Sequence, residues 1–219
     1  MNSDDVYLTR HGARIDTQDP SWLQKSTHNR SEDPHLSPAG QTSAVELAQA
    51  FTRLQHQSGV QLAHIISSPY IRCVETAHVV AEAMGVDVKI EPGIAEVNSS
   101  RTKQFLDATD LKAQFPLIET SYSPVLKYND LSIEYSDGAC AQRSADAALK
   151  VRENLDGTIL FVGHGASCLG IARAFGHGGY VGYSSLTHFV KRDGKWKLDG
   201  LFGDVAHLSD KKTSLDSAW

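Results

Sequence analysis

An arginine–histidine pair near the start of the chain, Arg10-His11, is the first feature that suggests chemistry, and Arg14 lies close behind it. The pair follows a short apolar run, residues 6–8, which predicts a β-strand that opens into a loop. Arginine presents a planar fork of donors that matches phosphate oxygens. Neighbouring cations disfavour a protonated histidine and neutralise the charge of a phosphoryl group. These residue types favour His11 as a nucleophile toward phosphorus over a general base, although a surface Arg–His pair would show the same triplet.

A second histidine flanked by glycines, His164, follows the most apolar strand predicted in the chain, residues 158–162. Such a continuous apolar run is typical of a central parallel strand that is covered on both faces. Arg72 falls in the first turn of a predicted helix, where a cation is electrostatically unfavourable. On its position alone, Arg72 is better interpreted as a solvated side chain than as an anion ligand.

The loops after different strands converge on one edge of an α/β sheet. We therefore expect a single cleft to hold three arginines and two histidines, namely Arg10, His11, Arg14, Arg72 and His164. Like charges at close range repel, and burying them costs free energy unless an anion compensates. Phosphate is the expected ligand, and no metal or cofactor is required because the arginines supply the positive charge.

The elements that position these residues alternate between strands and helices. The expected strands cover residues 6–8, 62–66, 86–90 and 158–162, and a hairpin pairs 185–192 with 195–201 around Asp193-Gly194. The expected helices run from Pro38 to Gly59, from Pro69 to Gly85, over 142–154 and over 168–175. This order predicts an α/β fold, a three-layer α/β/α arrangement with a largely parallel central sheet.

The organisation that we expect is one domain over residues 1–219, in which residues 97–139 form an insertion over the active site. Residues 15–37 are expected to be a long loop, and a loop of this length usually serves a site. These two segments are expected to determine specificity. The tail from Ser209 onward is expected to be frayed.

Composition limits the class of protein and its partners. The chain has 219 residues, 41% of them hydrophobic, and a formal net charge of −5, which argues against nucleic acid or membrane as the main partner. No apolar run approaches the roughly 20 residues that span a bilayer, and no signal-peptide pattern is visible. The three cysteines form no C-x-x-C pair, so we expect a reduced compartment, the cytoplasm or the nucleus.

Four motifs in a fixed order resemble those of the histidine phosphatase superfamily, in its phosphoglycerate-mutase-like branch. They are Leu8-Thr9-Arg10-His11-Gly12, Leu36-Ser37-Pro38-Ala39-Gly40, Ser67-Ser68-Pro69 with Arg72 and Glu75-Thr76-Ala77, and Val162-Gly163-His164-Gly165. Within the branch, Arg14-Ile15-Asp16, Trp22 and the run 67–77 are similar to the suppressor of T-cell receptor signalling and ecdysteroid-phosphate phosphatases. They are similar also to a phosphatase-like subunit of a fungal RNA polymerase III transcription factor.

The resemblance implies a metal-independent phosphomonoester hydrolase that forms a phosphohistidine on His11. Its substrate would be a phosphoprotein, as for a protein-tyrosine phosphatase, or a small phosphomonoester. The phosphoryl oxygens would be held by Arg10, Arg14, Arg72 and His164. Glu96 would be the general acid that protonates the leaving oxygen and then deprotonates water, and Glu91 is its nearest competitor for this role. The resemblance also suggests a homodimer.

Two alternatives to a hydrolase stay open from the sequence. A phosphoglycerate mutase shares the motifs, but Arg14 stands where the mutases carry their own asparagine and tryptophan pattern, which favours the phosphatase. A phosphate-recognition or scaffold domain with weak catalysis is the other alternative, because of the likeness to a transcription-factor subunit. The related phosphatases also carry a tryptophan after the acid, whereas Val97 follows Glu96 here, so the positioning of the acid is open.

Overall fold

The structure is a computed structural model that describes residues 4–26 and 30–215. At its centre is a six-stranded sheet in the order β3-β2-β4-β1-β5-β6. The strands are β1 (Val6–Arg10), β2 (Leu62–Ser67), β3 (Val88–Ile90), β4 (Thr158–Gly163), β5 (Thr187–Arg192) and β6 (Lys195–Leu198). The first four are parallel, and β5 and β6 add an antiparallel hairpin beside β1. The predicted largely parallel sheet is therefore confirmed.

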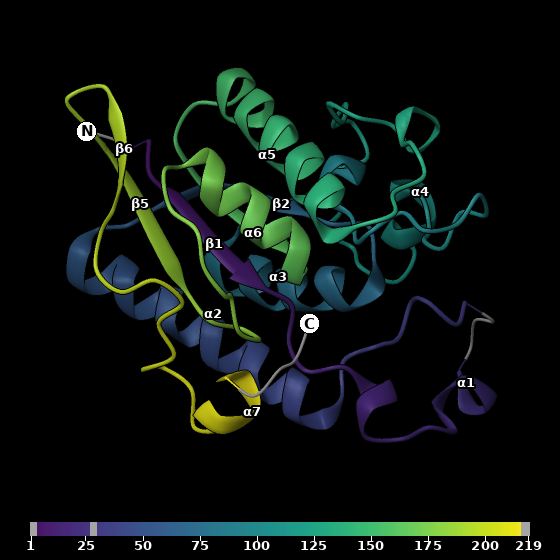
Figure 1. Cartoon of the computed structure of the whole chain (residues 1–219). Coiled ribbons are helices and arrows are strands. Elements are labelled where there is room, and N and C mark those ends of the chain that lie inside the picture. Colours follow the sequence, from purple (N-terminus) through teal and green to yellow (C-terminus); the bar gives the residue numbers. More distant parts are fainter. Residues whose placement is uncertain (1–3, 27–29, 216–219) are drawn as a thin grey trace.

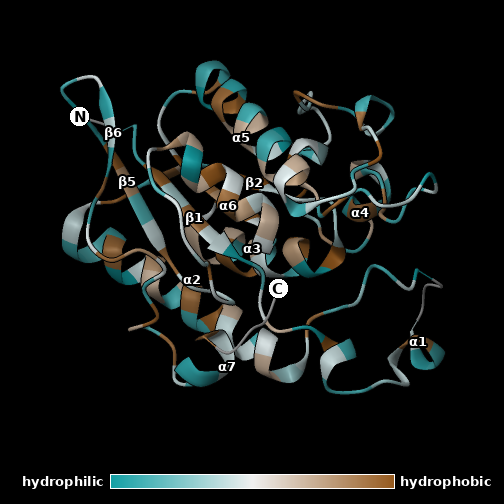
Figure 2. Ribbon diagram, in the orientation of Figure 1, coloured by the Kyte–Doolittle hydropathy of each residue, from teal (hydrophilic) through white to brown (hydrophobic). Residues whose placement is uncertain are grey.

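Helices cover both faces of this sheet, which completes the predicted three layers (Figure 1). The longer helices are α2 (Pro38–Ser58) and α3 (Ile71–Met84) on one face, and α5 (Asp137–Asn154) and α6 (Gly165–Ala174) on the other. The shorter ones are α1 (Trp22–Lys25), α4 (Ala108–Lys112), α7 (Lys211–Leu215) and the 3-10 turns η1 (Ile15–Thr17), η2 (Pro92–Ile94) and η3 (Tyr128–Asp130). In Figure 2, hydrophobic and hydrophilic residues alternate along α2 and α5, as expected for helices with one buried side.

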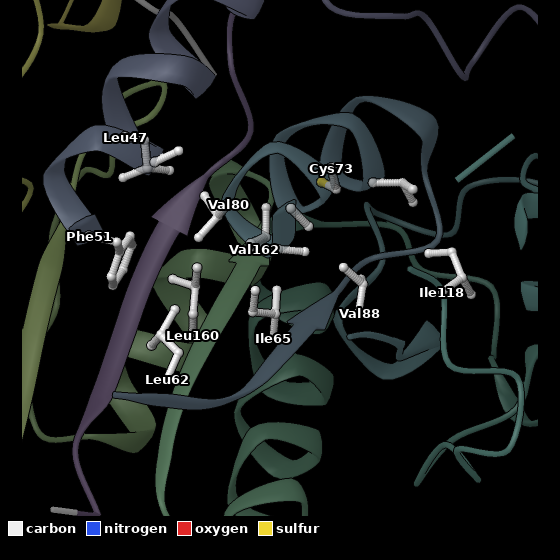
Figure 3. Close-up of a cluster of buried hydrophobic side chains, with 14 of the residues drawn as sticks. Leu47, Phe51, Leu62, Ile65, Cys73, Val80, Val88, Ile118, Leu160 and Val162 are labelled. Atoms are coloured by element: carbon white, nitrogen blue, oxygen red, sulfur yellow. The ribbon is translucent and has the colours of Figure 1, made fainter. Parts of the chain in front are cut away.

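The core is divided by the sheet because successive side chains of a strand point to opposite faces. In β4, Leu160 and Val162 face α2 and α3, whereas Ile159 and Phe161 face α5 and α6. Figure 3 shows the first of these clusters, in which Phe51 of α2 packs beside the strands. Burial of this kind on both faces fixes the register of the strands, and hence the edge at which their carboxyl ends meet.

The loop that carries Arg10 to Arg14 is pressed against the first turn of α2. Ser37 caps this helix by accepting a hydrogen bond from the Gly40 N–H (3.1 Å), and its own N–H donates to the Ala13 carbonyl (2.8 Å). A Cβ on Gly40 would lie 2.2 Å from the Ala13 oxygen, and one on Gly12 would lie 2.5 Å from the Gly40 oxygen. The two backbones therefore touch, which explains why glycine is needed in both motifs.

Several boundaries differ from those expected. Helix α5 begins at Asp137 rather than at 142, and β3 contains only Val88–Ile90. The expected frayed tail is wrong for the described residues, because 211–215 form α7 and Ser214 is buried, with its hydroxyl donating to the Tyr183 carbonyl (2.6 Å). A short helix with a buried anchor has too little periodic sequence to predict. No helix in 4–26 or 30–215 is long and apolar enough to cross a membrane.

We predict that Gly40→Ala lowers the free energy of unfolding by about 1–3 kcal/mol, because the new methyl group has no room against Ala13. Gly138→Ala is a matched control in the first turn of α5, where the nearest atom to an added Cβ is 3.7 Å away. This control should be neutral or slightly stabilising, since alanine favours a helix. Urea denaturation measures both; equal stability of the two variants would contradict the tight contact.

Candidate active site

His11 lies in the loop directly after β1, and only 1% of the residue is exposed. Its backbone N–H donates to the Gly163 carbonyl (3.0 Å), which extends the pairing of β1 with β4 by one residue. The ring is oriented by a hydrogen bond between Nδ1 and the Gly12 carbonyl (2.7 Å). Because a carbonyl can only accept, Nδ1 carries the proton and Nε2 keeps a lone pair. That lone pair is what a nucleophile needs.

His164 follows β4 at the same edge of the sheet, immediately before α6, and it is fully buried. Its Nε2 lies 2.7 Å from the Ser68 hydroxyl, and its Nδ1 lies 3.1 Å from Nη2 of Arg72. Because a guanidinium can only donate, this Nδ1 accepts and the proton sits on Nε2. The two histidine rings are 5.2 Å apart between centroids, so the predicted convergence of the two glycine-flanked histidines is observed.

Arg72 joins the two histidines and is only 1% exposed, so its interpretation as a solvated arginine is wrong. Its Nε lies 3.3 Å from Nε2 of His11, and its Nη1 donates to the Glu32 carbonyl (3.2 Å). Two carboxylates lie near it: Oε2 of Glu96 is 3.5 Å from Nη2, and Oδ1 of Asp33 is 4.0 Å from Nη1. Helix position alone could not predict this burial, because Glu32 and Asp33 reach Arg72 from a distant loop.

Arg10 and Arg14 line the mouth of the site. Arg10 is 5% exposed, and its guanidinium lies 4.4 Å from the ring centroid of Tyr183. The fork of Arg14 is engaged by both carboxylate oxygens of Asp16 (2.9 and 2.5 Å). Both arginines face a cavity of about 730 Å³, which Glu96 and Tyr183 also line. A bound phosphate would compete with Asp16 for Arg14.

The two glutamates that compete for the role of general acid have different environments. Oε2 of Glu96 lies 3.3 Å from Nδ1 of His164 and 3.5 Å from Nη2 of Arg72, and the side chain is 31% exposed. Glu91 is fully buried, and its carboxylate accepts four hydrogen bonds, from the N–H groups of Gly93, Val125 and Leu126 and from the Tyr122 hydroxyl. Glu91 therefore ties 122–126 to the end of β3. Of these two glutamates, Glu96 is the one that lines the cavity.

Burial and positive charge keep both histidines neutral. Burial lowers the pKa of His11 well below its usual range, and the charges of Arg72 and Arg10 lower it further. The pKa of His164 is lowered by burial first, and then by Arg72. Burial also raises the pKa of the nearby Cys73 thiol, so this cysteine stays protonated and packs as a small apolar group.

Other residues of the motifs act as supports for the loops. The Thr76 hydroxyl accepts from the Gly12 N–H (3.1 Å), and the Glu75 carboxylate binds the Leu36 N–H (2.7 Å) and His35 (2.8 Å). Through Thr76 and Glu75, α3 holds both the loop 10–14, here called the histidine loop, and the segment before α2. Sequence reasoning missed the contact roles of Ser68 and Tyr183; the position of Ser68 directly after a predicted strand was the available signal for the first.

The sheet order, the two histidines at its carboxyl edge and the buried arginines define an α/β protein with a cationic pocket at that edge. A model of the histidine phosphatase superfamily, branch 1, matches residues 6–199, and the chain belongs to this superfamily. The resemblance stated from the motifs is confirmed.

Three comparisons describe its relatives. An ecdysteroid-phosphate phosphatase of Drosophila melanogaster is 24% identical over 88% of this chain and 31% of its own length, so this chain spans less than a third of that relative. A probable phosphoglycerate mutase GpmB of Erwinia tasmaniensis is 24% identical over 96% of this chain and 97% of its own. The crystal structure of the ecdysone phosphate phosphatase from Bombix mori with tungstate superposes with a TM-score of 0.69 at 21% identity, covering 90% of this chain and 92% of that one. At this identity, the structural likeness shows the fold alone.

The neutral histidines predict acid-sensitive stability. Below a pH near 6.5 the unfolded chain binds protons at His11 and His164 that the folded chain does not bind, so stability falls as pH falls. Each histidine contributes up to about 1.4 kcal/mol per pH unit. We therefore expect His164→Asn to show a shallower decline than the wild type between pH 6.5 and about 5.

Urea denaturation in a phosphate-free buffer across this range measures the slopes. His56→Asn, an exposed position at the far end of α2, is the matched control and should keep the wild-type slope. Equal slopes for wild type and His164→Asn would show that His164 is not held neutral by the fold.

Proposed function

We propose that this protein is a metal-independent phosphomonoester hydrolase that works through a phosphohistidine on His11. The observation that carries the proposal is a neutral imidazole with its Nε2 lone pair free of a proton, 3.3 Å from the buried guanidinium of Arg72. A histidine held in this way is poor at donating protons and good at attacking phosphorus. The adjacent cations attract the phosphoryl group and stabilise its charge in the transition state.

In the first step, Nε2 of His11 attacks phosphorus and the bond from phosphorus to the leaving oxygen breaks. Arg10, Arg72 and Arg14, once released from Asp16, receive the phosphoryl oxygens. The proton for the leaving oxygen comes from Glu96, the one carboxyl group at the cavity that also contacts Arg72 and His164.

In the second step, Glu96 takes a proton from water, the water oxygen bonds to phosphorus, and the phosphorus–nitrogen bond to His11 breaks. Inorganic phosphate leaves and the neutral histidine is restored. His164 can assist at both steps because the Ser68 hydroxyl can reverse its hydrogen bond to Nε2. In that tautomer the His164 proton sits on Nδ1 and forms a hydrogen bond to a phosphoryl oxygen, while Nη2 of Arg72 donates to the phosphoryl group in place of Nδ1.

The lining of the cavity favours a hydrophilic substrate. Beyond the arginines, the described walls carry small apolar side chains, those of Ala13, Val97 and Ala166, and the ring of Tyr183. The polar side chains there are those of Thr17, Gln18, Glu32, Glu96, Ser99, Asp137 and Thr213. A steroid would place part of its apolar surface against the carboxylates of Glu32, Glu96 and Asp137 here. We therefore favour a small polar phosphomonoester over an ecdysteroid phosphate, and phosphotyrosine on a protein as the second substrate class.

We predict that the purified protein hydrolyses para-nitrophenyl phosphate in the presence of EDTA, and that His11→Ala lowers kcat by at least about 1,000-fold. The reason is that loss of the imidazole removes the atom that bonds to phosphorus. His56→Ala, at the far end of α2, is the control for handling and should keep full activity. Acid quenching with radiolabelled substrate should trap phosphoprotein in the wild type only. Absence of wild-type turnover over a broad pH range would overturn the proposed function.

A phosphoglycerate mutase is the second candidate, because a probable mutase of Erwinia tasmaniensis aligns over 97% of its length. Glu32 and Asp137 at the cavity wall disfavour the extra carboxylate of a phosphoglycerate. We predict that 3-phosphoglycerate with bisphosphoglycerate priming gives no measurable 2-phosphoglycerate in a coupled assay, while aryl phosphate hydrolysis persists in the same preparation. Isomerisation that is faster than hydrolysis would make the protein a mutase.

A further inference from the structure

The segment that carries Glu96 is held by one arginine of α5, Arg143. Its Nη1 donates to the carbonyls of Gly93 (2.8 Å) and Pro92 (3.4 Å), and its Nη2 donates to those of Ala95 (3.2 Å) and Glu96 itself (3.1 Å). Four backbone carbonyls within five residues therefore point at one guanidinium. The 3-10 turn η2 pairs the Pro92 carbonyl with the Ala95 N–H (3.1 Å), and Arg143 supplies donors to the carbonyls of the residues that follow.

Glu134 completes this arrangement from the segment before α5. Its two carboxylate oxygens accept from Nε (2.7 Å) and Nη2 (2.9 Å) of Arg143, as a bidentate pair that is almost fully buried. Oε2 also accepts from the Asn98 N–H (2.9 Å), and the Asn98 carbonyl accepts from the Glu134 N–H (2.9 Å). Arg143 and Glu134 thus hold the loop on both sides of Glu96, at 92–96 and at 98.

The side chain of Glu96 is oriented from the same loop. Its Oε1 accepts from the N–H of Val97 (3.1 Å), which leaves Oε2 toward His164 and Arg72. No large aromatic ring follows the acid to restrain it, because Val97 stands in that place. The carboxyl group therefore depends on its backbone for its position, and the backbone depends on Arg143.

We propose that the Arg143–Glu134 pair is the positioning device for the general acid, so that it acts on the reaction through Glu96 without touching the substrate. This inference rests on the proposed hydrolase function. Displacement of the acid impairs protonation of the leaving oxygen and leaves the phosphate ligands of β1, α3 and α6 in place. The loss should therefore be large for an alkyl phosphate, whose alkoxide needs the proton, and small for para-nitrophenyl phosphate, whose phenolate does not.

The test compares kcat on glycerol phosphate and on para-nitrophenyl phosphate for Arg143→Lys, which keeps the buried charge but loses the five-donor fork. We expect kcat on glycerol phosphate to fall roughly tenfold to a hundredfold, with little change for the aryl ester. In a Glu96→Gln background the same substitution should cause no further loss on glycerol phosphate, because the group that it positions is gone.

Arg152→Lys is the matched control. Arg152 lies on the same helix and also binds backbone carbonyls, those of Leu155 and Gly157, but at the opposite edge of the sheet. This substitution should leave kcat on both substrates unchanged. Because Glu134 is buried beside Arg143, the double variant Arg143→Gln/Glu134→Gln, which removes both charges, is tested in parallel and should show the same substrate-selective loss.

Each outcome has a separate meaning. Equal losses on the two esters in Arg143→Lys and the double variant, or a further loss in the Glu96→Gln background, would overturn the positioning role while the hydrolase function stands. A wild type without turnover on either ester would overturn the proposed function itself. A substrate-selective loss that disappears in the Glu96→Gln background would establish the role of Arg143.

Discussion

The Arg72 side chain lies between two histidines that the fold keeps neutral, and only 1% of the residue is exposed. Burying such a cation is costly unless anions or good acceptors surround it. The protein supplies a carbonyl, two imidazole nitrogens and two carboxylates at 3.5 and 4.0 Å, neither carboxylate in bidentate contact. The compensation is therefore partial, and a bound phosphoryl group is the anion that would complete it. The location at the start of α3 adds to this need, because the helix dipole is positive there.

The surrounding structure holds Arg72 and the neutral His11 in place. Asp33 accepts from the Ile71 N–H (2.7 Å), so the same carboxylate that faces Arg72 also anchors the start of α3. Thr76 fixes the histidine loop from the next turn of the helix. On its other side, the loop 10–14 is held by the backbone contact between Gly12 and Gly40. Arg72 and the neutral His11 can then keep the hydrogen bond from Nε to Nε2 (3.3 Å), since both backbones are held in place.

The fold and the convergence of the two histidines at one sheet edge followed from the sequence because they depend on local patterns. Apolar strands such as 158–162 and helix signals such as Ser37-Pro38 are short-range features, and the edge where strands end is set by topology. The features that the sequence did not predict depend instead on contacts between distant residues. The burial of Arg72 and the hydrogen bonds of Glu91 depend on residues 32–33 and 122–126, far away in the sequence. Arg143 lies on a helix with an ordinary charged pattern, and only the folded chain shows that its guanidinium donates both to the carbonyls of 92–96 and to Glu134.

The acid and the phosphate ligands must meet opposite requirements, and this explains why they come from different parts of the fold. A carboxylate in bidentate contact with Arg72 would neutralise the cation that the substrate needs, and it would give up its proton too readily. Glu96 avoids this by standing 3.5 Å away with 31% of its side chain exposed. A partly exposed side chain on a loop is mobile unless its backbone is fixed. The rigid sheet edge can supply the phosphate ligands, whereas an acid at this distance requires a separate support, and the buried Arg143–Glu134 pair is built to provide it.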